Sequence, residues 1–421
     1  MILHHTTYSL YHKNLCNLFS TITFDEIKIK SKIMKKRVLR YLKHIFATLI
    51  VLLAIGASIL IYENGSVHYA DNIEKMNWDN EGPYVFYEND SVLSLNYIKG
   101  NKTDGFSVDR KEFNQKIDAK SYFNLDKTAF SFTVNTDIKI PKAIYNDDEK
   151  IIAISDIESG YKTFRDFLIA NNVIDKHLNW IFGKGHLVLV GDFVDRGFST
   201  TQVLWFIYKL EQDAKKVGGN VHFILGNHEI KNLQGNYKSA SEKYLYIASI
   251  LQKQQFEFYG SNSFIGKWMA SKNTLELING HLFVHGGIHP ELANYNTNLN
   301  EINSIVRANY NLAAYPKKEK NLEQFLISTR TGPSWYRGYF KDDLTQEEIE
   351  KGLNIFNAKA VIVGHTIQGK VKKLYQGKVF AIDVKHANDY HKNWPNKESE
   401  GLLIENDSYY RVLNNGEKKE L

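Results

Sequence analysis

The strongest chemical pattern in the sequence is HLVLVGDFVDRG, residues 186–197. Its apolar half has the composition of a buried parallel strand, and Gly191 ends it at a loop that carries Asp192, Asp195 and Arg196. Open α/β sheets bind ligands in loops at the carboxyl ends of their strands. Two carboxylates on so short a loop need a partner, because a buried carboxylate without one is costly. A metal ion is the simplest partner.

An apolar strand followed by a polar loop recurs five times after residue 150. A single His or Asp behind a strand is more often structural than functional. Five such loops in succession, all delivering groups that bind metals or transfer protons, are difficult to explain by packing. The five loops deliver Asp156 and Glu158; Asp192, Asp195 and Arg196; Asn227, His228 and Glu229; His285; and His365.

The ordered motifs D-x-E, GDFVDRG, GNHE, HGG and GHT resemble those of the calcineurin-like metallophosphoesterase superfamily. The second and third motifs are closest to PPP-type serine/threonine protein phosphatases, and in particular to their bacterial and Shewanella-like branch. The resemblance extends over residues 151–384. It implies an αββα sandwich with two divalent metal ions at the strand ends, and hydrolysis of a phosphomonoester by direct attack of a hydroxide that bridges the two ions.

The resemblance also assigns the metal ligands. One carboxylate would bridge both ions, because its two oxygens can each bind a cation when the cations lie about 3.5–4 Å apart. The assigned ligands are Asp156 and Glu158 for the first ion, Asp192 for both ions, and Asn227, His285 and His365 for the second ion.

The remaining roles concern the phosphate and the leaving group. His228 would be the general acid that protonates the leaving oxygen, with Asp195 fixing its tautomer. Arg196 would hold the phosphate oxygens, for which its planar fork is well suited. Arg330 and Arg337 compete for a second phosphate contact, and we favour Arg337 because its WYRGY context resembles the Shewanella-like branch.

One position departs from the superfamily pattern. The first motif is usually D-x-H, and Glu158 occupies the place of the histidine. It is either a solvent-facing glutamate beside a weakly bound first ion or a carboxylate ligand. We favour the ligand, since a third carboxylate suits a hard ion such as Mn²⁺ or Mg²⁺. Manganese is the expected metal, with Fe, Zn and Mg as alternatives.

These residues require an α/β catalytic domain over residues 147–421. Within it, VLWFIYKLEQDAKK (residues 203–216) predicts an amphipathic helix that ends before Gly218 and Gly219. Residues 239–269 are predicted to be helical. Their expected buried face consists of Tyr244, Leu245, Ile247, Ala248 and Leu251.

The preceding residues, 63–146, alternate apolar and polar side chains in short runs and predict a small β-rich segment. It carries no recognisable chemistry. A lid, a spacer and a strand pair added to the catalytic sheet are equally compatible with it.

The amino-terminal region has the pattern of a membrane anchor. A basic segment, residues 1–44, precedes eighteen uninterrupted apolar residues, 45–62, which are long enough to span a bilayer. Acidic residues follow, so the positive-inside rule places the amino terminus in the cytoplasm and the catalytic domain on the non-cytoplasmic (periplasmic or extracellular) side. An uncleaved single-pass anchor is favoured over a cleaved signal, and Met34 is an alternative start to Met1.

Charge and cysteine content exclude two classes of protein. The net charge of +6 resides in residues 1–43, where nine Lys or Arg face Asp25 and Glu26, so the other 378 residues sum to −1. The basicity is therefore topogenic, and no nucleic-acid partner is expected. Cys16 is the only cysteine, which excludes a disulfide framework and a Cys-based zinc site.

The sequence thus predicts a membrane-anchored, metal-dependent phosphatase that acts on a phosphorylated protein or small molecule. Two alternatives are a hydrolase of nucleotides or dinucleoside polyphosphates, and a non-catalytic membrane-tethered binding module that kept the fold after losing the first metal. The physiological substrate, the preference for Ser/Thr or Tyr phosphate and the oligomeric state are not encoded in any motif that we can identify.

Overall fold

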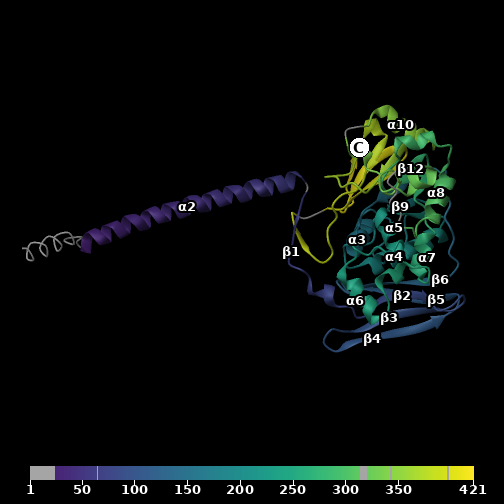
Figure 1. Ribbon diagram of the computed structural model, residues 1–421, viewed down its shortest axis with the longest axis horizontal. Helices are drawn as coiled ribbons and strands as arrows, with labels where there is room; N and C mark the ends of the chain where they lie inside the picture. Colours follow the sequence, from purple (N-terminus) through teal and green to yellow (C-terminus); the bar gives the residue numbers. More distant parts are fainter. Residues whose placement is uncertain (1–23, 64, 313–319, 342–343, 396–397) are drawn as a thin grey trace, which may run out of the picture. The chain divides into compact units, whose positions relative to one another are not determined.

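The computed structural model describes residues 24–63, 65–312, 320–341, 344–395 and 398–421 (Figure 1). The chain forms two compact units that divide after Glu63. Residues 1–23 of the expected basic segment, which include Cys16, lie outside the described residues.

The first unit contains one continuous helix, α2 (Phe24–Tyr62). The expected boundary between a basic segment and an apolar segment near residue 45 is therefore not a break in secondary structure. Residues Glu26–Tyr62 of α2 are long and apolar enough to cross a membrane. A signal sequence or the core helix of a soluble protein can pass the same test of length and composition.

The second unit is built on two six-stranded sheets that face each other (Figure 1). The first sheet has the order β10-β9-β8-β17-β18-β19, with β8, β9 and β10 parallel. The second has the order β14-β15-β13-β12-β11-β7, with β12, β13 and β15 parallel. The bounds are β7 Ile144–Tyr145, β8 Ile151–Ile154, β9 His186–Val190, β10 Asn220–Ile224, β11 Leu275–Ile278, β12 His281–Val284, β13 Ala360–Val363, β14 Lys372–Leu374, β15 Val379–Ala381, β17 Glu400–Glu405, β18 Ser408–Leu413 and β19 Lys418–Glu420.

The central strands are apolar throughout because both of their faces are covered. In β8, Ile151 and Ala153 belong to the core between the two sheets, whereas Ile152 and Ile154 belong to the larger core under the helices. A strand that is covered on both faces has no need of polar alternation. This explains the unbroken apolar runs that the sequence showed, and the sandwich confirms the expected αββα fold class.

Helices cover the outer faces of the sandwich. α4 (Thr200–Lys216) packs against β10 and α3 (Tyr161–Ala170), and α8 (Leu299–Ala308) packs against β11. The other helices are α5 (Asn227–Leu233), α6 (Glu242–Ile250), α7 (Phe264–Ala270), α9 (Leu322–Ile327) and α10 (Gln346–Asn354).

The β-rich segment forms a further layer that covers α4. Its strands are β2 (Glu81–Tyr87), β3 (Leu93–Asn101) and β4 (Gly105–Phe113) in one sheet, and β5 (Lys116–Phe123) and β6 (Thr128–Asn135) in another. The Trp205 ring of α4 stacks on Phe132 of β6 with 4.8 Å between centroids, and the Trp205 indole N–H donates to the carbonyl of Pro83 at 2.7 Å. One expectation for this segment was a strand pair added to the catalytic sheet. Only the short strand β7 of this segment joins a sheet of the sandwich, where it pairs with β11. The short strand β1 (Val67–Tyr69) pairs with β16 (Lys392–Trp394).

This layer overturns the prediction that α4 is amphipathic. Every residue from Thr200 to Leu210 is buried, because a sheet lies on one side of the helix and the β-rich layer on the other. The predicted helical region after residue 239 is also interrupted, by the 3-10 turn Gln255–Tyr259 between α6 and α7. Leu245, expected to be buried, is 46% exposed, whereas Tyr244, Ile247 and Ala248 are buried as expected.

Candidate active site

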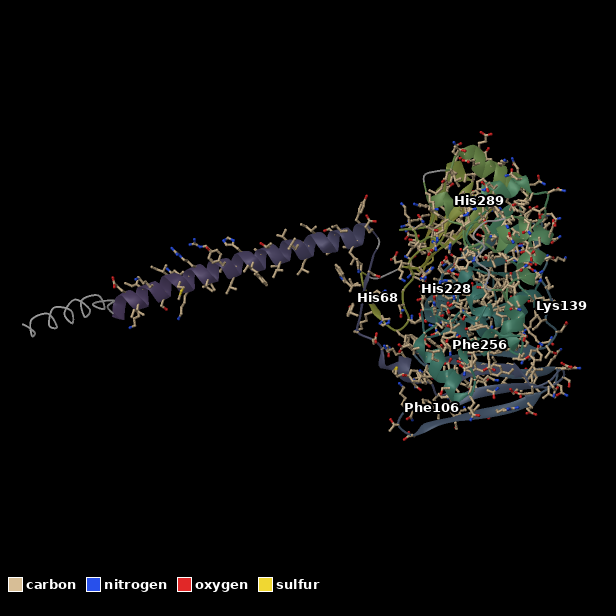
Figure 2. All side chains as sticks on the ribbon, viewed as in Figure 1. His68, Phe106, Lys139, His228, Phe256 and His289 are labelled. Atoms are coloured by element: carbon tan, nitrogen blue, oxygen red, sulfur yellow. The ribbon has the colours of Figure 1, made fainter. Side chains whose placement is uncertain are left out.

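The strands that precede the five predicted loops converge at one edge of the sandwich, and eight of the ten predicted site residues line one open hollow of about 680 Å³. The other two, Asp195 and His285, lie directly behind that surface and are buried. Figure 2 labels His228 within the second unit and Phe106 on the outlying β4. The eight lining residues are Asp156, Glu158, Asp192, Arg196, Asn227, His228, Arg337 and His365.

A buried glutamate fixes two of the loops to each other. The Glu229 carboxylate, in the first turn of α5, accepts backbone N–H groups of Asp192 at 2.9 Å, Phe193 at 2.8 Å and Gly226 at 2.9 Å. Gly226 is required here because a Cβ at that position would lie 2.3 Å from Oδ1 of Asp192. Glu229 therefore positions Asp192. The GNHE motif contains Glu229, but its sequence alone gave no role for it.

The second predicted metal site is a set of acceptor atoms. Single ligand atoms of Asp192, His285 and His365 all lie within 4.8 Å of one another, and all three residues are buried. Nδ1 of His285 is 2.7 Å from the Val190 carbonyl, so this nitrogen donates its proton there and Nε2 faces the site. His365 is held in the opposite sense, with Nε2 at 3.0 Å from the Trp335 carbonyl, which leaves Nδ1 facing the site. Backbone carbonyls that fix imidazole tautomers are usual behind metal-binding histidines.

Asn227 completes this set. One atom of its side-chain amide lies 2.8 Å from Nδ1 of His365, 3.2 Å from Nε2 of His285 and 3.3 Å from Oδ2 of Asp192. With the amide oxygen in this position and His285 deprotonated, four acceptors face one another, which is the arrangement that a cation requires. With the amide nitrogen there, it donates to the other three instead. The donor set therefore fits a divalent cation.

The electrostatics of the site favour positive charge next to Asp192. Burial acts to lower the pKa of His285, but the carboxylates of Asp192 and Asp156 outweigh it and raise the pKa to about 9. Burial acts to raise the pKa of Asp192, and His285 and His228 outweigh it, so the pKa of this carboxyl is lowered. Burial, and next to it His285, lower the pKa of His365 to about 2. A cation that binds here replaces the proton of His285.

His228 and Asp195 form the pair that the resemblance implied. Nδ1 of His228 lies 2.7 Å from Oδ2 of Asp195, whose other oxygen accepts the side-chain amide of Asn232 at 2.9 Å. The opposite nitrogen, Nε2, faces the hollow and lies 3.4 Å from a guanidinium nitrogen of Arg196. This geometry holds an imidazole with one nitrogen free to exchange a proton with a bound molecule.

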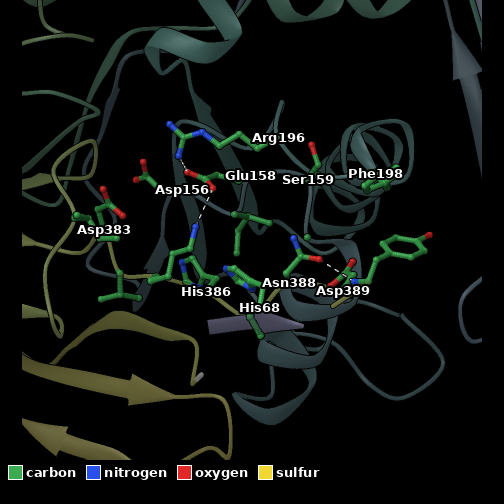
Figure 3. Close-up of a pocket in the computed structure, with 18 residues that line it drawn as sticks. His68, Asp156, Glu158, Ser159, Arg196, Phe198, Asp383, His386, Asn388 and Asp389 are labelled. Atoms are coloured by element: carbon green, nitrogen blue, oxygen red, sulfur yellow. Dashed lines mark hydrogen bonds and ion pairs between the residues drawn. The ribbon is translucent and has the colours of Figure 1, made fainter. Parts of the chain in front are cut away.

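Glu158 faces cations of the protein. One of its oxygens is paired with Arg196, which Figure 3 draws as a dashed line. The other oxygen lies 3.6 Å from Nζ of Lys385. Arg337 packs against the loop of His365, where its guanidinium donates to Oγ1 of Thr366 at 3.0 Å, and burial lowers its pKa. Arg330 lines the same hollow, so both competing arginines are at the site.

Three residues of the site were missed by the sequence analysis. Lys231 lies one turn after Asn227 in α5 and lines the hollow, and burial lowers its pKa. Lys385 and Asp383 follow β15, which forms a sixth strand and loop at the same edge. The signal for this sixth loop was present in the sequence VFAIDVKH, but β15 is only three residues long.

A sandwich of two mixed sheets that carries this donor set at the ends of its parallel strands fits a metal-dependent phosphatase. The chain belongs to the calcineurin-like phosphoesterase family, whose sequence model matches residues 149–369. As a member of this family, it binds divalent metal ions.

Two protein relatives and one solved structure support the Shewanella-like branch. Shewanella-like protein phosphatase 2 of Arabidopsis thaliana is 24% identical over 321 residues, which cover 63% of this chain and 77% of that protein. Shewanella-like protein phosphatase 1 of Plasmodium berghei (strain Anka) is 28% identical over 227 residues, 52% of this chain and 61% of that protein. The crystal structure of a cold-active protein-tyrosine phosphatase of a psychrophilic Shewanella species aligns with a TM-score of 0.71 and 32% identity, over 81% of this chain and 99% of that chain. Together these findings set aside the alternative of a non-catalytic binding module.

Proposed function

We propose that this protein is a membrane-anchored phosphatase that holds two divalent metal ions and hydrolyses phosphomonoesters, with phosphoproteins as its substrates. The observation that carries the proposal is the meeting of three groups in one hollow: the Asp192, His285, His365 and Asn227 acceptors, the His228–Asp195 pair, and the arginines. Bound divalent ions would supply Lewis acidity toward the phosphoryl oxygens and would lower the pKa of bound water.

The residues of the chain perform the remaining steps. Arg196 and Arg337 bind the phosphate oxygens and, with Lys231, compensate the charge that develops on them. Nε2 of His228 donates its proton to the oxygen of the departing alcohol, and Asp195 fixes the orientation of the ring through Nδ1. Because Arg196 is paired with Glu158, a bound phosphate competes with that carboxylate for the guanidinium.

A substrate panel tests the phosphoprotein assignment. Phosphoserine, phosphothreonine and phosphotyrosine peptides would be compared with dinucleoside polyphosphates at equal concentration in Mn²⁺ buffer. The relatives named protein phosphatases support the expectation that phosphopeptides have the higher kcat/KM. A higher kcat/KM for the dinucleoside polyphosphates would contradict it and favour the nucleotide hydrolase.

Metal analysis tests the dinuclear assignment. The purified protein, dialysed against Mn²⁺, is expected to contain two ions per chain. The change Asp192→Asn, at the predicted bridging ligand, should lower both the metal content and the turnover by orders of magnitude while the fold is retained. A wild-type turnover of p-nitrophenyl phosphate by this variant would contradict the proposed chemistry.

The membrane assignment rests on α2 and on the charges that flank its apolar part. Basic residues from Lys35 to Lys43 precede that part, and Glu63 and Asp71 follow it. We expect the full chain to sediment with membranes after a carbonate wash, with the catalytic unit protected from a protease added on the cytoplasmic side. Release by carbonate would contradict an anchor, and digestion in the second assay would reverse the topology.

A further inference from the structure

Asp383 is a buried carboxylate at the active-site edge that the family motifs leave without a role. It follows β15, the neighbour of β13 in the second sheet, so it reaches the same edge as His365. Its side chain is 6% exposed and lines the hollow together with Asp156, Glu158 and Asp192. In Figure 3 the carboxylate groups of Asp383, Asp156 and Glu158 gather in one part of the pocket, apart from Asp389.

The Asp383 carboxylate has no hydrogen bond and no ion pair to any residue in the described part of the chain. Asp389, six residues later, is the contrast, since its carboxylate accepts the backbone N–H groups of Lys162 at 2.9 Å and Thr163 at 3.1 Å. A buried carboxylate without such donors is costly unless a cation is next to it. The positive charges that act on Asp383 are those of Arg337 and Arg196, but neither arginine forms an ion pair with it.

Asp156 is a second buried carboxylate that lines the same hollow. One oxygen of Asp156 accepts the backbone N–H of His365 at 3.2 Å, and a Cβ at residue 364 would lie 2.5 Å from that same oxygen, which explains why glycine is found there. The fold thus places Asp156 in the same hollow as Asp383, with one of its oxygens held by a backbone N–H.

Glu158 is poorly placed to coordinate the first metal ion. Its two oxygens are engaged by Arg196 and Lys385, and its side chain is 22% exposed. Coordination of a metal through Glu158 would cost both of these ion pairs, whereas coordination through Asp383 costs no partner.

We propose that Asp383 is a ligand of the first metal ion, together with Asp156 and the bridging Asp192, and that Glu158 instead holds Arg196 and Lys385. This inference rests on the proposed two-metal function and proposes Asp383 in place of Glu158, the ligand that the sequence favoured. A site of three carboxylates selects hard divalent ions such as Mn²⁺ and Mg²⁺ over softer ones.

The experiment measures Mn²⁺ content and affinity rather than turnover. Wild type, Asp383→Asn, Glu158→Gln and Asp389→Asn would be dialysed against Mn²⁺, counted by mass spectrometry of the metal and titrated by calorimetry. Asp389→Asn is the matched control, because it makes the same change in the same loop at a carboxylate that has backbone donors. We expect two ions in the wild type, in Glu158→Gln and in Asp389→Asn, and one ion in Asp383→Asn. In Asp383→Asn the affinity of the first site for Mn²⁺ should fall by more than about 100-fold. About 100-fold is the upper end of the loss caused by removing an outer-shell partner, and Asp383 would be a direct ligand.

A second measurement covers the case in which Asp383→Asn alters the fold. In EDTA this variant should melt at or above the wild-type temperature, because it removes repulsion between buried carboxylates, and Mn²⁺ should raise its Tm less than it raises that of the wild type. Anomalous diffraction from wild-type crystals grown with Mn²⁺ should show an ion coordinated by Asp383.

Two results would overturn the inference: two ions of wild-type affinity in Asp383→Asn, or an anomalous peak coordinated by Glu158 and not by Asp383. Either result leaves a wild type that binds two ions, and so leaves the proposed function intact. A wild type that binds no metal and hydrolyses no phosphomonoester would instead contradict the proposed function itself.

Discussion

Many of the residues that would do the chemistry have a strained backbone conformation. Six of the ten predicted site residues have positive φ although none is glycine: Asp156, Glu158, Asp192, Asp195, Arg196 and His365 have φ between 48° and 69°. This left-handed region costs a non-glycine residue on the order of 1–3 kcal/mol. Such strain persists only where the surroundings fix the chain, as the Glu229 carboxylate does for the Asp192 loop. The site is therefore held in place before any ligand binds.

At this scale the first prediction concerns His228. His228→Ala should lower kcat on a phosphoserine peptide by about 10²- to 10⁴-fold, the usual contribution of a general acid. The loss on p-nitrophenyl phosphate should be much smaller, because p-nitrophenolate departs without needing a proton. Steady-state kinetics on both substrates measure the difference.

The control for this prediction is Asp195→Asn, which keeps the imidazole and removes the group that orients it. It should show the same preference for the better leaving group with a smaller overall loss. Equal losses on the two substrates in His228→Ala would mean that His228 binds or positions the phosphate and does not protonate the leaving oxygen.

At the scale of elements, the β-rich layer is an integral part of the catalytic unit's core. Phe132 on β6 is 6% exposed and contacts Trp205 of α4, the helix that directly follows the Asp192 loop. Lys243 and Glu81 add a buried ion pair at 2.9 Å between α6 and β2. These contacts are those of a fixed layer and not those of a lid that opens.

The second prediction follows from that packing. Phe132→Ala should lower the free energy of unfolding by about 3–5 kcal/mol, as expected for truncation of a buried aromatic side chain. Val108→Ala on β4, which removes a side chain that is 37% exposed, should cost far less. Urea unfolding measures both. Activity per folded molecule should be unchanged in both variants, and a lost activity in folded Phe132→Ala would mean that the layer contributes to the site.

The sequence predicted those elements whose cause is local. Strands β8, β9, β10, β12 and β13 are apolar runs that stop at a polar loop, and the structure has each of them. The burial of α4 was not predictable in this way, because residues 81–135, far away in the chain, cover its second face.

The same limit applies to the site. The residue at position 158 can be compared with a motif, but the sequence does not show that Arg196 and Lys385 reach it. Asp383 was missed because it follows a three-residue strand and stands in no motif that we compared. Both facts depend on contacts between loops, which an apolar pattern does not record.

At the scale of the whole molecule, charge is distributed unevenly. Residues 44–421 sum to a net charge of −1, yet six cations line the hollow against four carboxylates. A near-neutral chain that gathers cations at one place attracts phosphorylated groups to that place without binding polyanions over its whole surface. The lining cations are Arg196, Lys231, Arg330, Arg337, Lys341 and Lys385.

Stability of the whole fold should depend on pH through histidines that are kept neutral away from the site. His281 lies at the opposite end of β12 from the His285 loop, is 2% exposed and has Nε2 at 2.9 Å from the hydroxyl of Tyr409. Burial, and then the charge of Lys359, lower its pKa to about 4. The unfolded chain binds this proton at its ordinary pKa of about 6.5. The stability is therefore fully present above about pH 6.5 and is lost as the pH falls from there toward 4, because the unfolded state binds more protons in that window.

The third prediction is that protonation of His281 in the unfolded chain lowers the free energy of unfolding by about 2 kcal/mol between pH 7 and pH 5. Urea unfolding at both pH values would be carried out in EDTA, so that release of metal does not add its own pH dependence. His281→Gln keeps a partner for the Tyr409 hydroxyl but has no titrating group. Over the same pH interval it should lose about 2 kcal/mol less stability than the wild type loses. The control His177→Gln, at an exposed loop position, should follow the wild type, because water solvates that side chain in both states. If His281→Gln and the wild type lose equal stability, the acid sensitivity of the fold arises from the active-site carboxylates and histidines and not from the buried imidazole at the far end of the strand.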